Sequence, residues 1–320
     1  MQQHSYEHTL SFALEHPWAL TRPMLAVVAD LLARRIAHEP VDHDAIAAAL
    51  VAKANRGGVA GTRRAETAAT VIPVYGVIAP RMNLLSDMSG GTTFETLTSQ
   101  LRAAVADPRV TQIVFDVDSP GGNAAGATEF AKEVLAARAK KRIVAVASHT
   151  MASAAYWAMA GASEIVATPS SMVGSIGVFS IHDDITESLA KLGIKRTVLS
   201  AGKFKGEGVD GGPLSVEAAA HVQSLIDSAY GRFVAAVAAG RNVPPSRVRA
   251  GFGEGRVLDA EAARAAHLVD RIATLDDVLG HVDTTAANVA LAHREQELAA
   301  VSQAMREREL EALVSRRRLQ

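Results

Sequence analysis

The chain has 320 residues, of which 48% are hydrophobic and 21% charged, and its formal net charge is −1. A nearly neutral chain has no strong overall field toward nucleic acid or anionic lipid, and 4% aromatic residues provide few stacking platforms for single-stranded nucleic acid. The sequence contains no cysteine, which excludes disulfides, thiolate metal sites and a cysteine nucleophile.

The sequence predicts a protein with no membrane contact. No apolar stretch reaches the length of a membrane span. The first residues lack the basic start and apolar core of a secretory signal. We therefore expect a cytoplasmic protein, with neither a signal peptide nor a transmembrane segment.

The N-terminal part differs in composition from the rest. Residues 1–53 have a mostly helical pattern, which Pro17 and Pro23 interrupt. Residues 54–70 are rich in glycine, threonine and arginine, which is typical of a linker. The histidines scattered here match no metal-ligand spacing, so we expect no metal. Residues 1–70 are thus predicted to form a helical arm and a linker.

Short β-branched runs and alanine-rich helical runs alternate after this linker. Such alternation predicts βαβ units around a mostly parallel sheet, whose ligand sites lie at the carboxyl ends of the strands. The predicted strands cover residues 71–78, 110–117, 143–147, 164–167, 176–179, 197–199 and 268–272. The predicted helices cover residues 93–106, 125–139, 154–162, 185–192, 215–239 and 260–266.

Ser153 stands where a buried strand passes into an alanine-rich helix. A serine at this place can cap the helix with its hydroxyl. It can also attack a substrate carbonyl while nearby backbone N–H groups hold the oxyanion. Position alone favours the cap, because capping serines greatly outnumber catalytic ones.

Three further loops carry residues that could take part in catalysis. The glycine turn that ends at Gly122 either closes a tight strand–helix connection or aims an N–H at an oxyanion. Ser175 lies in a glycine-flanked turn, for which a structural role is the simpler interpretation. Lys203 and Lys205 alternate about Phe204, and a lysine acts as a general base only where burial keeps it neutral. Periodicity does not choose between the two lysines.

A Ser-His-Asp arrangement is a second hypothesis for Ser153. His149 precedes the serine, and residues 182–184 read His-Asp-Asp. Triads occur in any chain order. However, Met151 and Ala155 occupy the glycine positions of the Gly-x-Ser-x-Gly elbow. We rank this hypothesis below one in which a lysine serves as the base.

Taken in order, these motifs resemble the S49 peptidase family. The resemblance covers roughly residues 70–275, and its motifs are Ser-Pro-Gly-Gly, Ala-Ser-Ala-Ala-Tyr-Trp, Gly-Ser-Ile-Gly-Val and Gly-Lys-Phe-Lys. The terminal arms resemble the phage capsid-maturation branch more than the membrane-bound signal-peptide-peptidase branch. The resemblance implies an α/β, ClpP/crotonase-like fold with repeated ββα units over residues 71–282, and helical arms on both sides.

The resemblance also implies site residues and their roles. Ser153 would be the nucleophile, Lys205 the general base and Ser175 the residue that orients the lysine. The backbone N–H groups of Gly122 and Ala154 would form the oxyanion hole. Many family members carry Gly-Gly after the nucleophile, whereas this chain has Ala-Ala, which keeps the N–H groups but narrows the space. No cofactor and no metal are implied.

The expected function is that of a serine endopeptidase acting in phage prohead assembly. Its partners would be a protein or peptide substrate, further copies of itself in a homo-oligomer, and phage capsid, scaffold or portal proteins. The tail over residues 283–320 fits a solvated helix and a docking arm equally well. The alternatives are degradation of short peptides as in signal peptide peptidases, a crotonase-type acyl-CoA enzyme, and a non-catalytic scaffold component.

Overall fold

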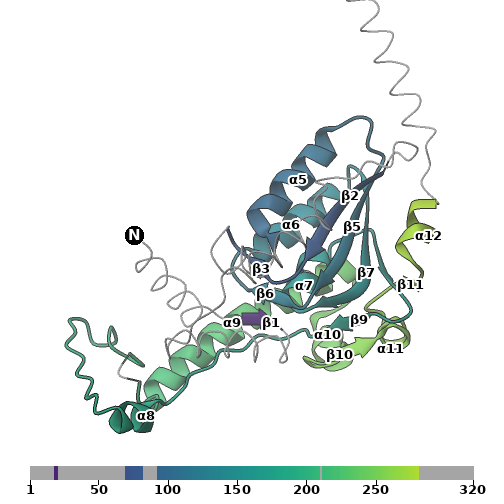
Figure 1. Cartoon of the computed structure of the whole chain (residues 1–320). Helices are drawn as coiled ribbons and strands as arrows, with labels where there is room; N and C mark the ends of the chain where they lie inside the picture. The colour runs from purple at the N-terminus through teal and green to yellow at the C-terminus, as the bar shows by residue number, and fades with distance from the viewer. Residues whose placement is uncertain (1–17, 21–68, 82–91, 210, 281–320) are drawn as a thin grey trace, which may run out of the picture.

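The computed structural model describes residues 18–20, 69–81, 92–209 and 211–280 (Figure 1). The predicted C-terminal tail and nearly all of the predicted N-terminal arm lie outside these residues. Among the described helices, none combines the length and the apolar content that a membrane crossing requires.

A seven-stranded sheet forms the centre of the fold. Its main path runs β10-β9-β7-β5-β2. On the side of β7 away from β5, β8 pairs with the first part of β7 and β9 with its end, and β11 pairs with β8. All pairings are parallel except that of β10 with β9. The predicted α/β class with a mostly parallel sheet is therefore confirmed. The strands are β2 (Ala69–Tyr75), β5 (Gln112–Ser119), β7 (Arg142–Ala152), β8 (Glu164–Ala167), β9 (Met172–Gly174), β10 (Val257–Asp259) and β11 (Arg271–Ile272).

A smaller sheet continues from the carboxyl ends of β2 and β5. Its order is β1-β6-β3-β4. The chain passes from β2 through β3 and β4 into α5, and from β5 through β6 into α6, which confirms the predicted ββα repeat. The elements are β1 (Trp18–Leu20), β3 (Ile78–Ala79), β4 (Thr92–Thr93), β6 (Gly121–Asn123), α5 (Phe94–Ala106) and α6 (Ala127–Ala137).

Helices cover one face of the main sheet and enclose the larger hydrophobic core (Figure 1). They are α5, α6, α7 (Ala154–Met159) and the C-terminal half of α9 (Val216–Arg241). The rings of Trp157 in α7 and Phe233 in α9 stack with centroids 4.6 Å apart. The opposite face packs against α12 (Leu275–Gly280) in a smaller core. Two short helices, α10 (Pro245–Gly251) and α11 (Ala260–Ala265), complete the domain.

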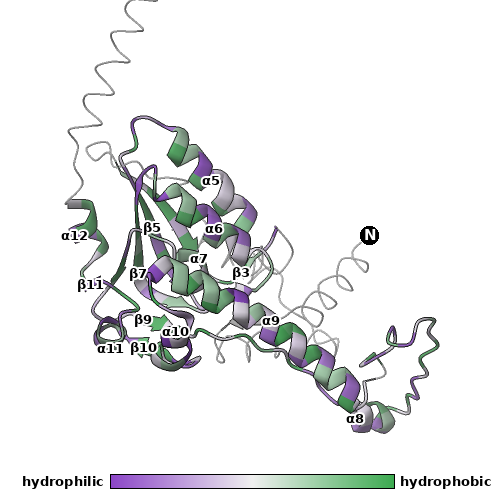
Figure 2. Cartoon of the chain, turned by 180° about the vertical axis from the view of Figure 1, so that it is seen from behind, coloured by the Kyte–Doolittle hydropathy of each residue, from purple (hydrophilic) through white to green (hydrophobic). Residues whose placement is uncertain are grey.

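An extended arm projects from this body. It consists of residues 180–209 and 211–214, including α8 (Thr186–Lys191), together with the N-terminal half of α9 (Figures 1 and 2). Its apolar side chains are unusually exposed. The exposed members are Ile181, Ile185, Leu192, Ile194, Leu199, Phe204, Val209, Val216 and Leu225.

Three secondary-structure predictions are wrong. Residues 197–199 are not a strand, and of residues 176–179 only Phe179 forms an isolated bridge. A β-branched run forms a strand only beside a partner, and neither run joins a described sheet. Trp18–Leu20 was expected to be helical but forms β1, which pairs with β6. The strand predicted over residues 268–272 is confirmed only at its end, as β11.

Candidate active site

Ser153 occupies a strained backbone position between β7 and α7. Its φ of 56° and ψ of −120° lie where residues with a side chain are rarely found. Such a conformation costs about 1–3 kcal/mol and persists only where the surroundings impose it. The Ser153 N–H donates to the Gly174 carbonyl at 2.8 Å, and its carbonyl accepts from the Trp157 N–H at 2.9 Å. Backbone hydrogen bonds on both sides thus fix the serine.

The Ser153 hydroxyl is buried and makes no hydrogen bond within the described part of the chain. The residue is 1% exposed. Ser153 does not cap α7 with its side chain, so the capping interpretation is wrong. A buried hydroxyl without a partner costs about 1–3 kcal/mol. Strain and an unpaired hydroxyl at one serine point to chemistry, because neither stabilises the fold.

The glycine turn before β6 lies next to this serine. Ser119, the last residue of β5, pairs with Met151 of β7, so the turn and Ser153 follow neighbouring strand ends. Helix α7 packs against β6. The Ser119 hydroxyl donates to the Gly76 carbonyl at 2.7 Å and accepts from the Gly121 N–H at 3.2 Å, which locks the turn. The fold therefore places Gly122 and Ala154, the first residue of α7, near the same strand ends as Ser153.

Gly122 must be glycine for a packing reason. A Cβ atom at this position would lie 1.9 Å from the Ile78 carbonyl oxygen, which belongs to the backbone of β3. The parallel pairing of β3 with β6 thus requires a residue without a side chain.

The structure also brings the backbone of Ser175 close to that of Ser153. Ala152 of β7 pairs with Gly174 of β9, and Ser175 follows directly. Ser175 has a φ of 55°, and its N–H donates to the Arg256 carbonyl at 2.7 Å. A second serine in a strained conformation therefore lies next to the carbonyl that holds the Ser153 backbone.

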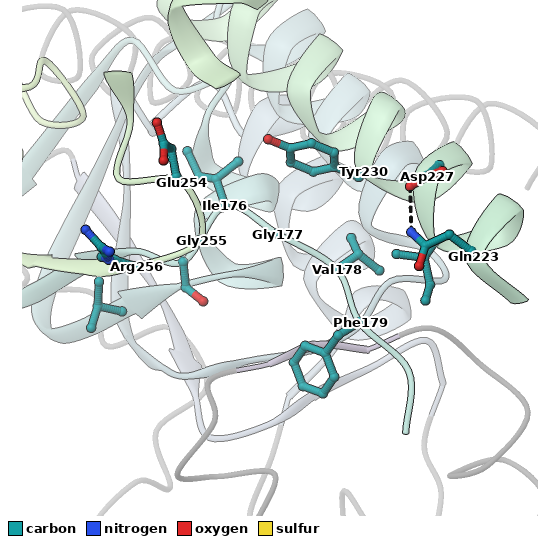
Figure 3. A pocket seen from close by; sticks show the side chains of 13 residues that line it. Ile176, Gly177, Val178, Phe179, Gln223, Asp227, Tyr230, Glu254, Gly255 and Arg256 are labelled. Atoms are coloured by element: carbon teal, nitrogen blue, oxygen red, sulfur yellow. Dashed lines mark hydrogen bonds between the residues drawn. The ribbon is translucent and has the colours of Figure 1, made fainter. Parts of the chain in front are cut away.

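A cavity of about 1040 Å³ opens beside Ser175 (Figure 3). Residues 175–179 form one wall, and residues 254–257 form another. The third wall is a face of α9 with Gln223, Ile226, Asp227 and Tyr230. The Gln223 amide donates to the Asp227 carboxylate at 2.8 Å. The cavity thus offers both apolar and polar contacts next to Ser175.

Lys205 lies at the other end of α9. It is exposed, and the Lys203 ammonium beside it pairs with Glu217 in the first turn of that helix at 3.1 Å. Glu217 is about 24 Å along the helix axis from Phe233, at the usual rise of about 1.5 Å per residue. Phe233 stacks on Trp157, one turn after Ser153. Within one copy of the chain, the fold does not bring Lys205 to Ser153.

The Ser-His-Asp hypothesis finds no support in the geometry. The His149 ring is exposed and lies 3.8 Å from Asp118, whereas the His182 ring bonds to the Gly212 carbonyl at 2.7 Å in the arm. Neither ring forms a hydrogen bond with the Ser153 hydroxyl. In the part of the chain that the structure describes, no cluster of three or more acidic or histidine side chains could hold a metal.

A polar network ties together the strands that carry the site. Asp116 in β5 accepts hydrogen bonds from the hydroxyls of Tyr75 in β2 and Ser148 in β7. Burial, followed by the bond to Asp116, raises the pKa of Tyr75. Tyr75 therefore stays protonated and keeps donating, which fixes the carboxyl ends of three neighbouring strands.

A second set of contacts holds α7. The Tyr156 hydroxyl donates to the Leu268 carbonyl at 2.8 Å, and Asp270 pairs with Arg241 of α9 at 2.6 Å. Burial pushes the pKa of Asp270 up, but hydrogen bonds from Arg241 and the Ile165 N–H outweigh burial and hold that pKa below its ordinary value. Asp270 therefore stays ionised and anchors the C-terminal end of α9 beside α7.

Sequence reasoning missed the residues that hold the site together. The Gly174 and Arg256 carbonyls and the Ile78 backbone carry no side-chain chemistry and so gave no signal. Ser119 did carry one, because it opens the Ser-Pro-Gly-Gly motif.

The sequence of this chain is similar to those of known proteases. Residues 136–290 match the model of peptidase family S49. Protease 4 of Salmonella typhi is 33% identical over 67% of this chain, which spans 34% of that protein. The putative protease slr0021 of Synechocystis is 30% identical over 60% of this chain and 69% of its own length. Capsid assembly protease C of Escherichia phage lambda is 30% identical over 80% of this chain and 59% of its own length.

The chain thus spans about a third of Protease 4 and less than two thirds of the lambda protein. Among solved structures, a ClpP1 mutant from Listeria monocytogenes matches 65% of this chain and 94% of its own, with a TM-score of 0.42 and 14% identity.

Proposed function

This chain belongs to peptidase family S49, and from that premise we propose that it hydrolyses peptide bonds with Ser153 as the nucleophile. The observation that carries the proposal is the Ser153 hydroxyl itself, which is buried, unpaired and held on strained backbone at the end of β7. The glycine turn at Gly122 and the start of α7 lie next to it.

The proposed reaction is acyl transfer in two steps. The Ser153 oxygen bonds to the scissile carbonyl carbon while its proton passes to an uncharged lysine amine, which we assign to Lys205. The N–H groups of Gly122 and Ala154 hold the oxyanion, and loss of one such donor typically costs about 3 kcal/mol of barrier. The lysine then protonates the leaving amine, and a water molecule releases the acyl-enzyme. Ser175 is proposed to orient the lysine.

We propose that Lys205 reaches the nucleophile of a neighbouring copy. In its own chain Lys205 lies at the far end of α9 from Ser153, on an arm whose apolar side chains are exposed. An arm of this composition suits burial against a second copy. The cavity beside Ser175 would receive the partner's Lys205, which makes a homo-oligomer a condition of activity.

The proposed substrates are proteins of a phage prohead, namely scaffold, portal or the chain itself. The support is the similarity over 80% of this chain to a protein named as a capsid assembly protease. The similarity to Protease 4 favours a second candidate, the degradation of short peptides. From the low aromatic content of the sequence, 4%, we expect small or aliphatic residues at the cleavage position in either case.

Peptide hydrolysis by variants tests the proposal. Purified full-length protein should cleave fluorogenic tri- and tetrapeptides that end in alanine or leucine, and Ser153→Ala should lose this activity by at least about a thousandfold. Ser246→Ala, at an exposed serine of α10, serves as the matched control and should keep wild-type turnover. Equal turnover of Ser153→Ala and wild type would end the proposal.

A further inference from the structure

The N-terminal strand β1 adds to the small sheet at the site. It pairs with β6 in antiparallel register and forms the outer edge of the sheet, in the order β1-β6-β3-β4. The pairing joins residues more than 100 positions apart in the sequence. The opposed pairs are Trp18 with Asn123, Ala19 with Gly122, and Leu20 with Gly121.

Gly122 consequently has a neighbouring strand on both sides. Ile78 of β3 lies opposite it on one side, and Ala19 of β1 on the other. The β3 side is closed, because the backbones there are so close that not even a Cβ atom fits at Gly122. A substrate backbone that reaches Gly122 within this sheet can only take the place of β1.

Extended peptides commonly bind by adding a strand to a sheet edge, where main-chain hydrogen bonds supply affinity. Without β1, β6 would be such an edge, directly beside the nucleophile. β1 is three residues long, and strand pairs of this size are marginally stable in water. The segment is short and its backbone is extended, as a replaceable occupant of a sheet edge must be.

We propose that residues 18–20 occupy the peptide-binding edge of β6 in the free chain and that a substrate peptide displaces them. The inference rests on the proposed function, because it identifies the edge along which the substrate would bind. The occupant acts as an internal competitor. If it holds the edge nine-tenths of the time, the apparent affinity for an added peptide falls about tenfold.

A reversible cross-link can test this in a chain that has no cysteine of its own. Directly opposed Cα atoms in an antiparallel pair lie about 4.5–5.5 Å apart, within disulfide range. The test variant is Trp18→Cys with Asn123→Cys, and the control is Leu20→Cys with Asn123→Cys. The control pair is two residues out of register, about 7–8 Å apart, and should not cross-link efficiently.

Fluorescence polarisation measures peptide binding by variants that also carry Ser153→Ala. The probe is a labelled synthetic peptide of residues 14–24 of this chain. The oxidised test variant should bind the probe at least about tenfold more weakly than its reduced form, because the cross-link holds the competitor in place. Reduction with dithiothreitol should restore binding, so each variant serves as its own reference.

Proline variants provide an independent measurement without a cross-link. The N–H groups of an antiparallel strand point alternately toward and away from the partner. Either Ala19→Pro or Leu20→Pro must therefore remove a donor to β6, and that variant should bind the probe up to about tenfold more tightly than the unsubstituted chain.

Three results would overturn the inference. They are cross-linking of the test pair no better than that of the control pair, equal probe binding by the oxidised and reduced forms, and no probe binding by any reduced or proline variant. None of these readouts requires hydrolysis. A failure of the proposed function would appear separately, as absent turnover in the wild type.

Discussion

Ser153 is held by its backbone and not by its side chain. Two main-chain hydrogen bonds fix it at a φ of 56°, while its hydroxyl makes no bond within the described part of the chain. A residue under such strain weakens the fold, so the surrounding strands must over-determine its position. The pairings of β7 with β5 and with β9 supply that constraint.

Gly122→Ala should disturb the site through its neighbour Ile78. The new Cβ would lie 1.9 Å from a backbone oxygen, so β3 or β6 must move. We expect a loss of about 1–3 kcal/mol in the free energy of unfolding, as for other overpacked positions. We also expect turnover to fall about a hundredfold or more, because the oxyanion donor shifts.

Gly280→Ala, at the end of α12 and away from the cavity, is the matched control for this variant. Its Cβ would meet nothing within 4 Å, and the position has no positive φ. Urea denaturation and peptide hydrolysis should leave this control near wild type. Wild-type stability and turnover in Gly122→Ala would contradict the packing described for β3 and β6.

The sequence indicated candidate site residues where a serine or a glycine turn follows a predicted strand. Ser153 and the Gly122 turn were found because they follow strand ends, and the structure places them together. The sequence could not choose between capping and reactivity at Ser153, since that depends on φ and on hydrogen bonds that only the fold defines. The roles assigned to Ser153, Lys205, Ser175, Gly122 and Ala154 remain predictions.

Helix α9 belongs to two environments. Its C-terminal half carries Phe233, Val234 and Val237, which are buried in the main core. Its N-terminal half extends along the arm, where Leu225 is 46% exposed. One continuous helix thus connects the core near α7 to the exposed arm (Figure 2).

Replacing an apolar side chain of α9 by alanine should therefore lower the free energy of unfolding by different amounts in the two halves of the helix. Phe233→Ala removes a fully buried ring that stacks on Trp157, and we expect it to lower the free energy of unfolding by about 3–5 kcal/mol. Leu225→Ala, the matched control on the arm, should change it by no more than about 0.5 kcal/mol in a dilute, unassembled sample. Similar losses for both variants by urea denaturation would show that the arm packs onto its own body.

Elements were predictable where the pattern was long and periodic. The helix predicted over residues 215–239 is confirmed as α9, within two residues at each end. Periodicity identified its apolar face but not what covers that face. The strands predicted over residues 176–179 and 197–199 failed for a related reason, because a strand depends on a partner that local sequence does not specify.

At the scale of the whole molecule, the fold separates the two halves of the proposed dyad. Ser153 is buried in the body, and Lys205 is exposed on the arm. Apolar side chains such as Leu199, at 93% exposure, lie along the same arm and favour contact with another copy. We therefore predict a site built from two copies of the chain.

The mixing of two inactive variants tests this claim most directly. Ser153→Ala and Lys205→Ala should each fail to hydrolyse peptides, whereas Lys203→Ala, the matched lysine control, should remain active. If subunits of the two inactive proteins are exchanged in equal amounts, about a quarter of the sites should combine an intact serine with the partner's Lys205, and activity should return in that proportion. Full activity of Lys205→Ala alone, or a mixture that remains inactive after exchange, would contradict the account.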